Sequence, residues 1–279
     1  MKPPLLLIGQ GSNDDAYSAE FGRFVHRLRC RLDQTAVSGG YLQHATPLLG
    51  ESVASLVARG HHRLVALPMS LGRAERDVAA AMALEQQRHP TLMYDGTRPL
   101  GADPRLLALL ADRLTEAAAD ISRPRPLELV GARPRLRAVE SAPADEFPSH
   151  VEPGETAVVL VGEGSTDPDA NAEIHRVSRL FWETHAYDYM TVETAFVSVT
   201  PPGVPGGLER CRRLGARRVI VVPYLLFAGG LLERVWAQAL AYGAGHPELD
   251  IRCAEAIGDC EALADVVIER YEEALQLVP

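Results

Sequence analysis

The order of apolar and polar residues predicts short buried strands that alternate with amphipathic helices. Short aliphatic runs bounded by turn residues are typical of strands in a parallel sheet, and apolar residues at helical spacing are typical of amphipathic helices. In the first half this pattern predicts strands near 3–8, 36–42, 63–67 and 92–94, with helices near 15–32, 48–59, 74–88 and 106–118. Such alternation favours a parallel sheet with helices on both faces.

The second half of the chain repeats the first. Gly9 matches Gly162, and the segments 41–47 and 58–68 match 196–202 and 213–223 at nearly constant spacing. The repeat predicts strands near 157–161, 190–198, 217–222 and 249–253, with helices near 170–184, 203–213, 231–243 and 260–276. We therefore expect an α/β fold of two tandem duplicated domains over 1–120 and 154–279. The proline-rich segment 121–153 would connect them, with one short strand near Leu127–Val130.

Composition and charge limit the kinds of molecule that the protein is expected to bind. The 279 residues carry a formal net charge of −9, which argues against a general affinity for nucleic acid or for acidic membrane surfaces. No apolar run approaches the roughly 20 residues of a membrane-spanning helix, and the N-terminus lacks the pattern of a signal peptide. The four cysteines have no CxxC spacing, so reduced thiols are expected. We expect a cytoplasmic protein that binds neither nucleic acid nor membranes.

A glycine turn after the first strand of each half marks a candidate ligand site. The turns read Gly-Gln-Gly-Ser at 9–12 and Gly-Glu-Gly-Ser at 162–165, and a helix is predicted after each. Ligands of open α/β sheets bind where strands end and helices begin, because backbone N–H groups converge there. A dinucleotide is not favoured, because the third glycine of its fingerprint is absent.

Several longer segments of the second half carry a family resemblance: 162–172 (GEGSTDPDANA), 207–211 and 214–218, 223–227 (PYLLF) and 269–274 (ERYEEA). With the repeat, they resemble the long two-domain form of the sirohydrochlorin cobaltochelatase family, the class II chelatases. The resemblance implies a lyase of cobalamin or siroheme biosynthesis that inserts a divalent metal into sirohydrochlorin, an acidic tetrapyrrole. Co²⁺ is the first expectation for the metal, with Ni²⁺ and Fe²⁺ as alternatives. Metal and macrocycle would bind in a cleft between the two halves, without a tightly bound cofactor.

The first half departs from the family's pattern at the positions that handle metal and protons. The family's first strand ends in Gly-His-Gly, where this chain has Gln10, and a family glutamate after the second strand is replaced by Gln43. The loop after the third strand lacks the family's second histidine, and Arg73 is the nearest match. The second half offers Glu163 and Ser198 at the equivalent positions. Glutamine cannot act as a base near neutral pH and is a poor metal ligand.

These positions define the expected site. The expected residues are Gln10, Gln43 and Glu163 for catalysis, Glu163 and His44 for the metal, and Ser12, Arg73, Arg76, Ser165 and Ser198 for the substrate. The competing interpretation is that most of these are polar residues of a solvated cleft. In that interpretation Arg73 and Arg76 belong to a solvated helix start. Because neighbours on a strand point to opposite faces, His44 is expected to point away from Gln43. His61 and His62 lie in a turn at the opposite end of the sheet and are expected to be exposed.

Two functional interpretations follow from the resemblance and its exceptions. The family's activity favours an enzyme with an altered site. The replaced residues favour a catalytically degenerate relative, a pseudoenzyme, that binds a tetrapyrrole or metal or pairs with an active chelatase. A homodimer is a further expected arrangement.

Overall fold

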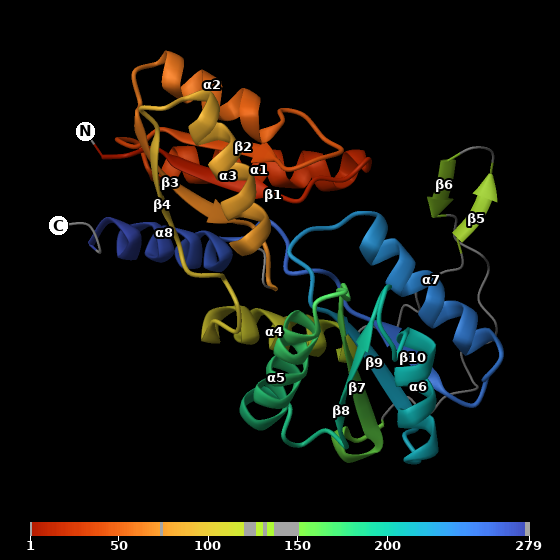
Figure 1. Ribbon diagram of the computed structural model, residues 1–279. Coiled ribbons are helices and arrows are strands. Elements are labelled where there is room, and N and C mark those ends of the chain that lie inside the picture. The colour runs from red at the N-terminus through yellow and green to blue at the C-terminus, as the bar shows by residue number, and fades with distance from the viewer. Residues whose placement is uncertain (1, 73–74, 120–126, 131–132, 137–150, 277–279) are drawn as a thin grey trace. The chain divides into compact units, whose positions relative to one another are not determined.

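The computed structural model describes residues 2–72, 75–119, 127–130, 133–136 and 151–276, with side chains at 75–76, 127–130 and 133–136 excepted. Two four-stranded parallel sheets form its framework (Figure 1). The first has the order β2-β1-β3-β4, from β1 (Leu5–Gly9), β2 (Val37–Tyr41), β3 (Arg63–Pro68) and β4 (Met93–Gly96). The second has the order β10-β9-β7-β8, from β7 (Thr156–Gly162), β8 (Val192–Phe196), β9 (Arg218–Pro223) and β10 (Asp250–Cys253).

The two sheets have the same topology, which confirms the predicted duplication of an α/β fold. The helices of the first half are α1 (Asp15–Arg31), α2 (Leu49–Ala58), α3 (Glu75–Arg88) and α4 (Pro104–Ala119). Those of the second half are α5 (Pro168–His185), α6 (Val204–Arg213), α7 (Gly230–Ala244) and α8 (Glu261–Gln276). The short 3₁₀ helix η1 (Pro153–Glu155) precedes β7. Between the halves, β5 (Leu127–Val130) is the expected strand, and it pairs antiparallel with β6 (Arg133–Leu136), which was not expected.

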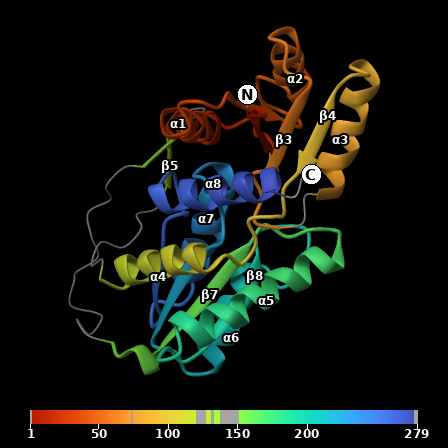
Figure 2. The ribbon, with the colours of Figure 1, turned by 90° about the vertical axis from the view of Figure 1, so that its left-hand side faces the viewer.

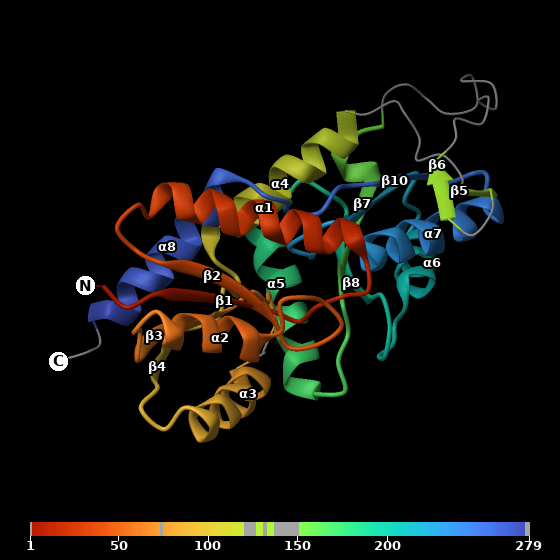
Figure 3. The ribbon, with the colours of Figure 1, turned by 90° about the horizontal axis from the view of Figure 1, so that it is seen from above.

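The core of the first sheet follows from strand alternation. Leu6 and Ile8 of β1 share a buried cluster with residues of α2 and α3, whereas Leu5 and Leu7 point to the opposite face. Figure 3 shows α1 on one side of this sheet and α2 and α3 on the other. In the second sheet, residues of α6 and α7 likewise share one cluster with β7, β8, β9 and β10.

The last helix of each half packs on the sheet of the other half. One compact unit comprises Met1–Leu106, Leu226–Gly229 and Ile257–Pro279, so α8 lies in the unit of the first sheet, where it contacts β3 and α1. The other comprises Leu107–Leu225 and Gly230–Ala256, and it contains α4 from Leu107 onward. In Figures 1 and 2, α4 and α5 lie on the same face of the second sheet. Each compact unit thus combines segments from both halves of the sequence, because apolar helix faces are buried on non-sequential partners.

Aromatic and polar contacts hold the exchanged segments in the first unit. Phe227 packs among aromatic rings of α1, with its ring centroid 5.7 Å from that of Phe24. The carboxylate of Glu20 accepts hydrogen bonds from the backbone N–H groups of Ala228 (2.6 Å) and Asp259 (3.3 Å). On α8, the guanidinium of Arg270 is buried and donates to Asp103 over 2.7 Å.

No helix in the described ranges is long and apolar enough to cross a membrane.

The helix exchange predicts a crossed pattern of destabilisation. Leu263 of α8 and Leu110 of α4 are both fully buried, so each change to alanine should cost about 2–5 kcal/mol through lost burial and a residual cavity. Leu263→Ala should accelerate amide hydrogen exchange in β1 and β3, and Leu110→Ala should do so in β7 and β9. Leu56→Ala on α2 is the control, because it should affect only the sheet of its own half. The crossed packing would be contradicted if Leu263→Ala accelerated amide hydrogen exchange in β7 and β9, and Leu110→Ala did so in β1 and β3.

Candidate functional site

In each unit a glycine turn lies at the carboxyl edge of the sheet, beside the loop that follows the neighbouring strand. The backbone N–H of Gln43 donates to the carbonyl of Gln10 over 3.2 Å. In the second unit, the N–H of Ser198 donates to the carbonyl of Glu163 over 3.1 Å. The structure therefore brings the expected pair Gln10 and Gln43 together in one unit, and the equivalent pair Glu163 and Ser198 together in the other.

The close approach of turn and loop requires glycine. Gly11 and Gly164 have φ angles of +90° and +91°. A Cβ atom on Gly11 would lie 1.7 Å from the carbonyl oxygen of Gln43, and one on Gly164 would lie 2.0 Å from that of Ser198. The second glycine of each turn is therefore fixed by both backbone conformation and space.

His44 and Val199 occupy matching positions at the tips of these loops. Both are exposed and have left-handed backbone, with φ angles of 61° and 66°. This backbone is uncommon for any residue other than glycine and is rare for a β-branched residue such as Val199. Strand alternation does not govern the direction of His44, because β2 ends at Tyr41 and both Gln43 and His44 belong to the following loop. His44 and Gln43 are both exposed beside the glycine turn.

The serines of the two turns begin the following helices. The hydroxyl groups of Ser12 and Ser165 accept hydrogen bonds from the N–H groups of Asp14 (3.1 Å) and Asp167 (3.0 Å). Those aspartates in turn accept from the first-turn N–H groups and serve as N-caps of α1 and α5. The serine oxygens are thus used to shape the turn.

Asn171 is a residue of this site that the sequence did not single out. Its side chain accepts from the N–H of Ser165 (2.9 Å) and donates to the carbonyl of the same residue (2.8 Å). This pair of bonds fixes the segment after Gly164. The residue at the matching position of the first half is Ser18. The repeat therefore gave no indication that an asparagine side chain would bind the turn.

Glu163 is the ionisable group of the second turn. Desolvation raises the pKa of its carboxyl above the ordinary value. The side chain is nevertheless solvent-exposed, so water still hydrates its charged form. The raised pKa therefore matters for the reactivity of the carboxylate and not for the stability of the fold. A carboxylate with a raised pKa is a stronger proton acceptor than an ordinary one.

Other expected site residues are placed differently. Arg73 lies outside the described residues, as does the side chain of Arg76. His61 and His62 precede β3, at the opposite edge of the sheet from Gln10, and His62 lies 3.0 Å from the hydroxyl of Thr91. Within the described ranges, no group of three or more His, Cys, Asp or Glu side chains could hold a metal ion.

Comparison with known proteins identifies the family. Duplicated parallel sheets with paired glycine turns define an α/β protein of two chelatase-like halves. Residues 4–117 and 157–274 match the family model CbiX. The chain belongs to the CbiX family, which confirms the resemblance at the family level.

Relatives differ in the metal that their names specify. The chain is 28% identical over 276 residues to a sirohydrochlorin cobaltochelatase of Priestia megaterium, covering 98% of this chain and 80% of that protein. A sirohydrochlorin ferrochelatase of the same organism is 22% identical over 234 residues, covering 83% of this chain and 76% of that one. The structure of SirB from Bacillus subtilis with Fe³⁺ aligns with a TM-score of 0.72 at 19% identity, over 98% of this chain and 96% of that chain.

The turn geometry predicts unequal effects for two alanine substitutions. Gly164→Ala introduces left-handed strain and a clash with the Ser198 carbonyl, so the turn must shift. Gly215→Ala is the matched control, because Gly215 has φ +93° and nothing lies within 4 Å of the added Cβ. The control should lose about 1 kcal/mol of unfolding free energy, the usual cost of left-handed backbone. Gly164→Ala should lose clearly more in urea unfolding, and equal losses would exclude the close approach as the constraint.

Proposed function

We propose that this protein inserts a divalent metal ion into sirohydrochlorin, with Co²⁺ as the preferred metal and Ni²⁺ or Fe²⁺ as alternatives. The proposal is supported by the similarity, over 98% of this chain, to a protein named sirohydrochlorin cobaltochelatase. The observation that carries the chemistry is Glu163, an exposed carboxylate with a raised pKa on the glycine turn of the second unit.

Metal insertion requires a proton acceptor. Two pyrrole N–H protons must leave the macrocycle as the divalent ion takes their place on the four nitrogens. Glu163 is proposed to accept the two protons one after the other and to pass each to water, because the exposed side chain remains in contact with bulk water. Gln10 and Gln43 cannot take up protons, and their amides are proposed to donate hydrogen bonds to the acidic side groups of the substrate. His44 is proposed as a weak metal contact, since neutral imidazole binds Co²⁺.

One observation favours a second candidate function. The described residues contain no group of three or more His, Cys, Asp or Glu side chains that could hold a metal ion, so these residues offer few ligands for an ion before insertion. A relative that has lost insertion would still bind the tetrapyrrole, alone or with an active chelatase as partner. In that case Glu163 would contact substrate without affecting the rate of metallation.

Absorbance of sirohydrochlorin mixed with the protein, before and after addition of Co²⁺, separates the two candidates. We expect metallation faster than in the absence of protein, and about 100-fold slower catalysis for Glu163→Gln, the usual contribution of a positioned base. Glu183→Gln is the control, because Glu183 is an exposed carboxylate of α5 in the same unit. A spectral shift on binding without acceleration would establish the non-catalytic candidate. No spectral change at all would exclude both.

The raised pKa of Glu163 predicts a pH dependence. The carboxylate is the active form of a base, so the insertion rate should fall as the pH drops through its folded-state pKa, which lies above the ordinary glutamate value. The residual rate of Glu163→Gln should lack this acid limb, which a pH–rate profile under saturating substrate would detect. An identical acid limb in both proteins would assign the titration to the substrate.

A further inference from the structure

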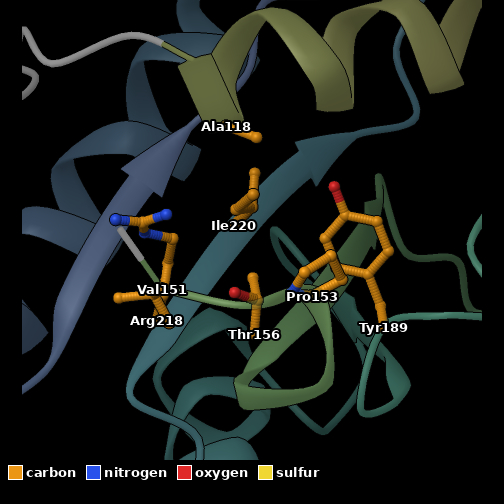
Figure 4. A pocket seen from close by; sticks show the side chains of 7 residues that line it. All are labelled: Ala118, Val151, Pro153, Thr156, Tyr189, Arg218 and Ile220. Carbon is orange, nitrogen blue, oxygen red and sulfur yellow. The ribbon is translucent and has the colours of Figure 1, made fainter. Parts of the chain in front are cut away.

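The second unit contains a cavity of about 230 Å³ at the amino edge of its sheet (Figure 4). Its lining includes Thr156 and Arg218, the first residues of β7 and β9. Glu163 follows the last residue of β7, at the other end of that strand. The cavity is therefore separate from the proposed active site, which is shaped by contacts at the carboxyl edge of the sheet.

At the carboxyl edge, a side chain of α7 binds the loop beside the turn of Glu163. The Nε2 atom of Gln238 donates to the backbone carbonyl of Val197 over 3.1 Å, and Val197 is only 4% exposed. The last ladder pair of β7 and β8 joins Gly162 and Phe196, so this carbonyl lies beyond the ladder. A buried carbonyl without a donor is costly, and the Gln238 amide therefore stabilises this conformation of the loop.

The same peptide group binds the turn of Glu163 on its other side. The carbonyl of Val197 and the N–H of Ser198 belong to one peptide group, and that N–H donates to the carbonyl of Glu163 over 3.1 Å. The hydroxyl of Ser198 donates to the same carbonyl over 3.3 Å. Gln238 therefore holds one end of the peptide group that binds the backbone of Glu163 with its other end. Bonds in such a chain polarise and strengthen one another.

α7 is a fixed support for this contact. Val235 and Ala239 of the helix are fully buried in the core cluster of the second sheet. The indole Nε1 of Trp236 donates to the carbonyl of Ala254, just beyond the end of β10, over 3.2 Å. Packing and a second hydrogen bond thus fix the helix, so the amide of Gln238 has a defined place relative to the loop.

The first half lacks this amide. α3 and α7 match at one constant spacing in the sequence, which also relates the His-Pro pair after each helix and the buried residues Val78 and Val235. At that spacing the residue that matches Gln238 is Ala81, whose methyl group cannot donate a hydrogen bond. The amide thus accompanies the turn that carries a glutamate and not the turn that carries a glutamine.

We propose that Gln238 is a positioning residue for Glu163. Its amide fixes the peptide group between Val197 and Ser198, and that peptide group fixes the turn from which the carboxylate extends. The consequence for metal insertion rests on the proposed function, whereas the effect on the turn does not. Because a misplacement of about 1 Å at a reacting group can cost roughly 100-fold in rate, loss of the amide should slow insertion without weakening substrate binding.

Gln238→Met keeps the length of the side chain and removes the donor. It should lower kcat for insertion of Co²⁺ into sirohydrochlorin about tenfold, with KM changed less than about twofold. Gln86→Met is the matched control, because the amide of Gln86 also donates to a backbone carbonyl over 3.1 Å, that of Leu92 before β4, at the amino edge of the first sheet. The control should keep the kcat of the unsubstituted protein. Equal kcat in the two variants would overturn the proposal.

A double substitution separates positioning from a general weakening of the fold. In a Glu163→Gln background there is no base to position, so Gln238→Met should then change kcat less than about twofold. A merely structural role would lower kcat by the same factor in both backgrounds. An undiminished tenfold loss in the Glu163→Gln background would therefore overturn the proposal.

Amide hydrogen exchange of the full-length protein tests the positioning without a metallation assay. The N–H of Ser198 should exchange at least about tenfold faster in Gln238→Met, because its acceptor on the turn is no longer held in place. Gln86→Met should leave this exchange rate unchanged. Unchanged exchange at Ser198 in Gln238→Met would overturn the proposal. If the unsubstituted protein does not accelerate metallation, the proposed function fails, and exchange at Ser198 alone decides whether Gln238 positions the turn.

Discussion

Burial of both faces of a four-stranded parallel sheet is the constraint on which the rest of this structure depends. With the strand order 2-1-3-4, right-handed crossovers place the first connecting helix on one face and the next two on the other. One face of each sheet is therefore covered by a single helix of its own half. The exchanged helices α8 and α4 cover the remainder, so each half of the sequence completes the core of the other half's sheet.

The two glycine turns share their backbone conformation but differ in the side chains that they carry. In both units the glycine turn accepts a hydrogen bond from the same position of the neighbouring loop, and the loop tip has left-handed backbone. These features depend on glycine and on the backbone, so duplication preserves them. The side chains at the equivalent positions differ, with glutamine in the first turn and glutamate in the second. The same scaffold therefore presents a neutral amide in one unit and a proton acceptor in the other.

Burial also divides the two halves electrostatically. The pair Arg63–Asp95 of the first sheet is partly exposed and hydrogen-bonded at two atoms, whereas the pair Arg218–Asp250 of the second sheet is buried and shares its carboxylate with Arg252. Screening by water makes the first pair of little consequence for stability. In the second, burial makes any donor left without an acceptor costly.

The sequence by itself determined the duplication, the parallel α/β class, the family and the position of the two glycine turns, because these depend on local periodicity and on short motifs. The resemblance also named Gln10, Gln43, Glu163 and Ser198 as residues of the expected site. Only the tertiary structure decided the helix exchange, the clamp of Asn171 on Ser165 and the hydrogen bond of Gln238 to Val197. These depend on which distant surfaces pack together, and the free energy of such packing is not encoded in the periodicity of any single segment.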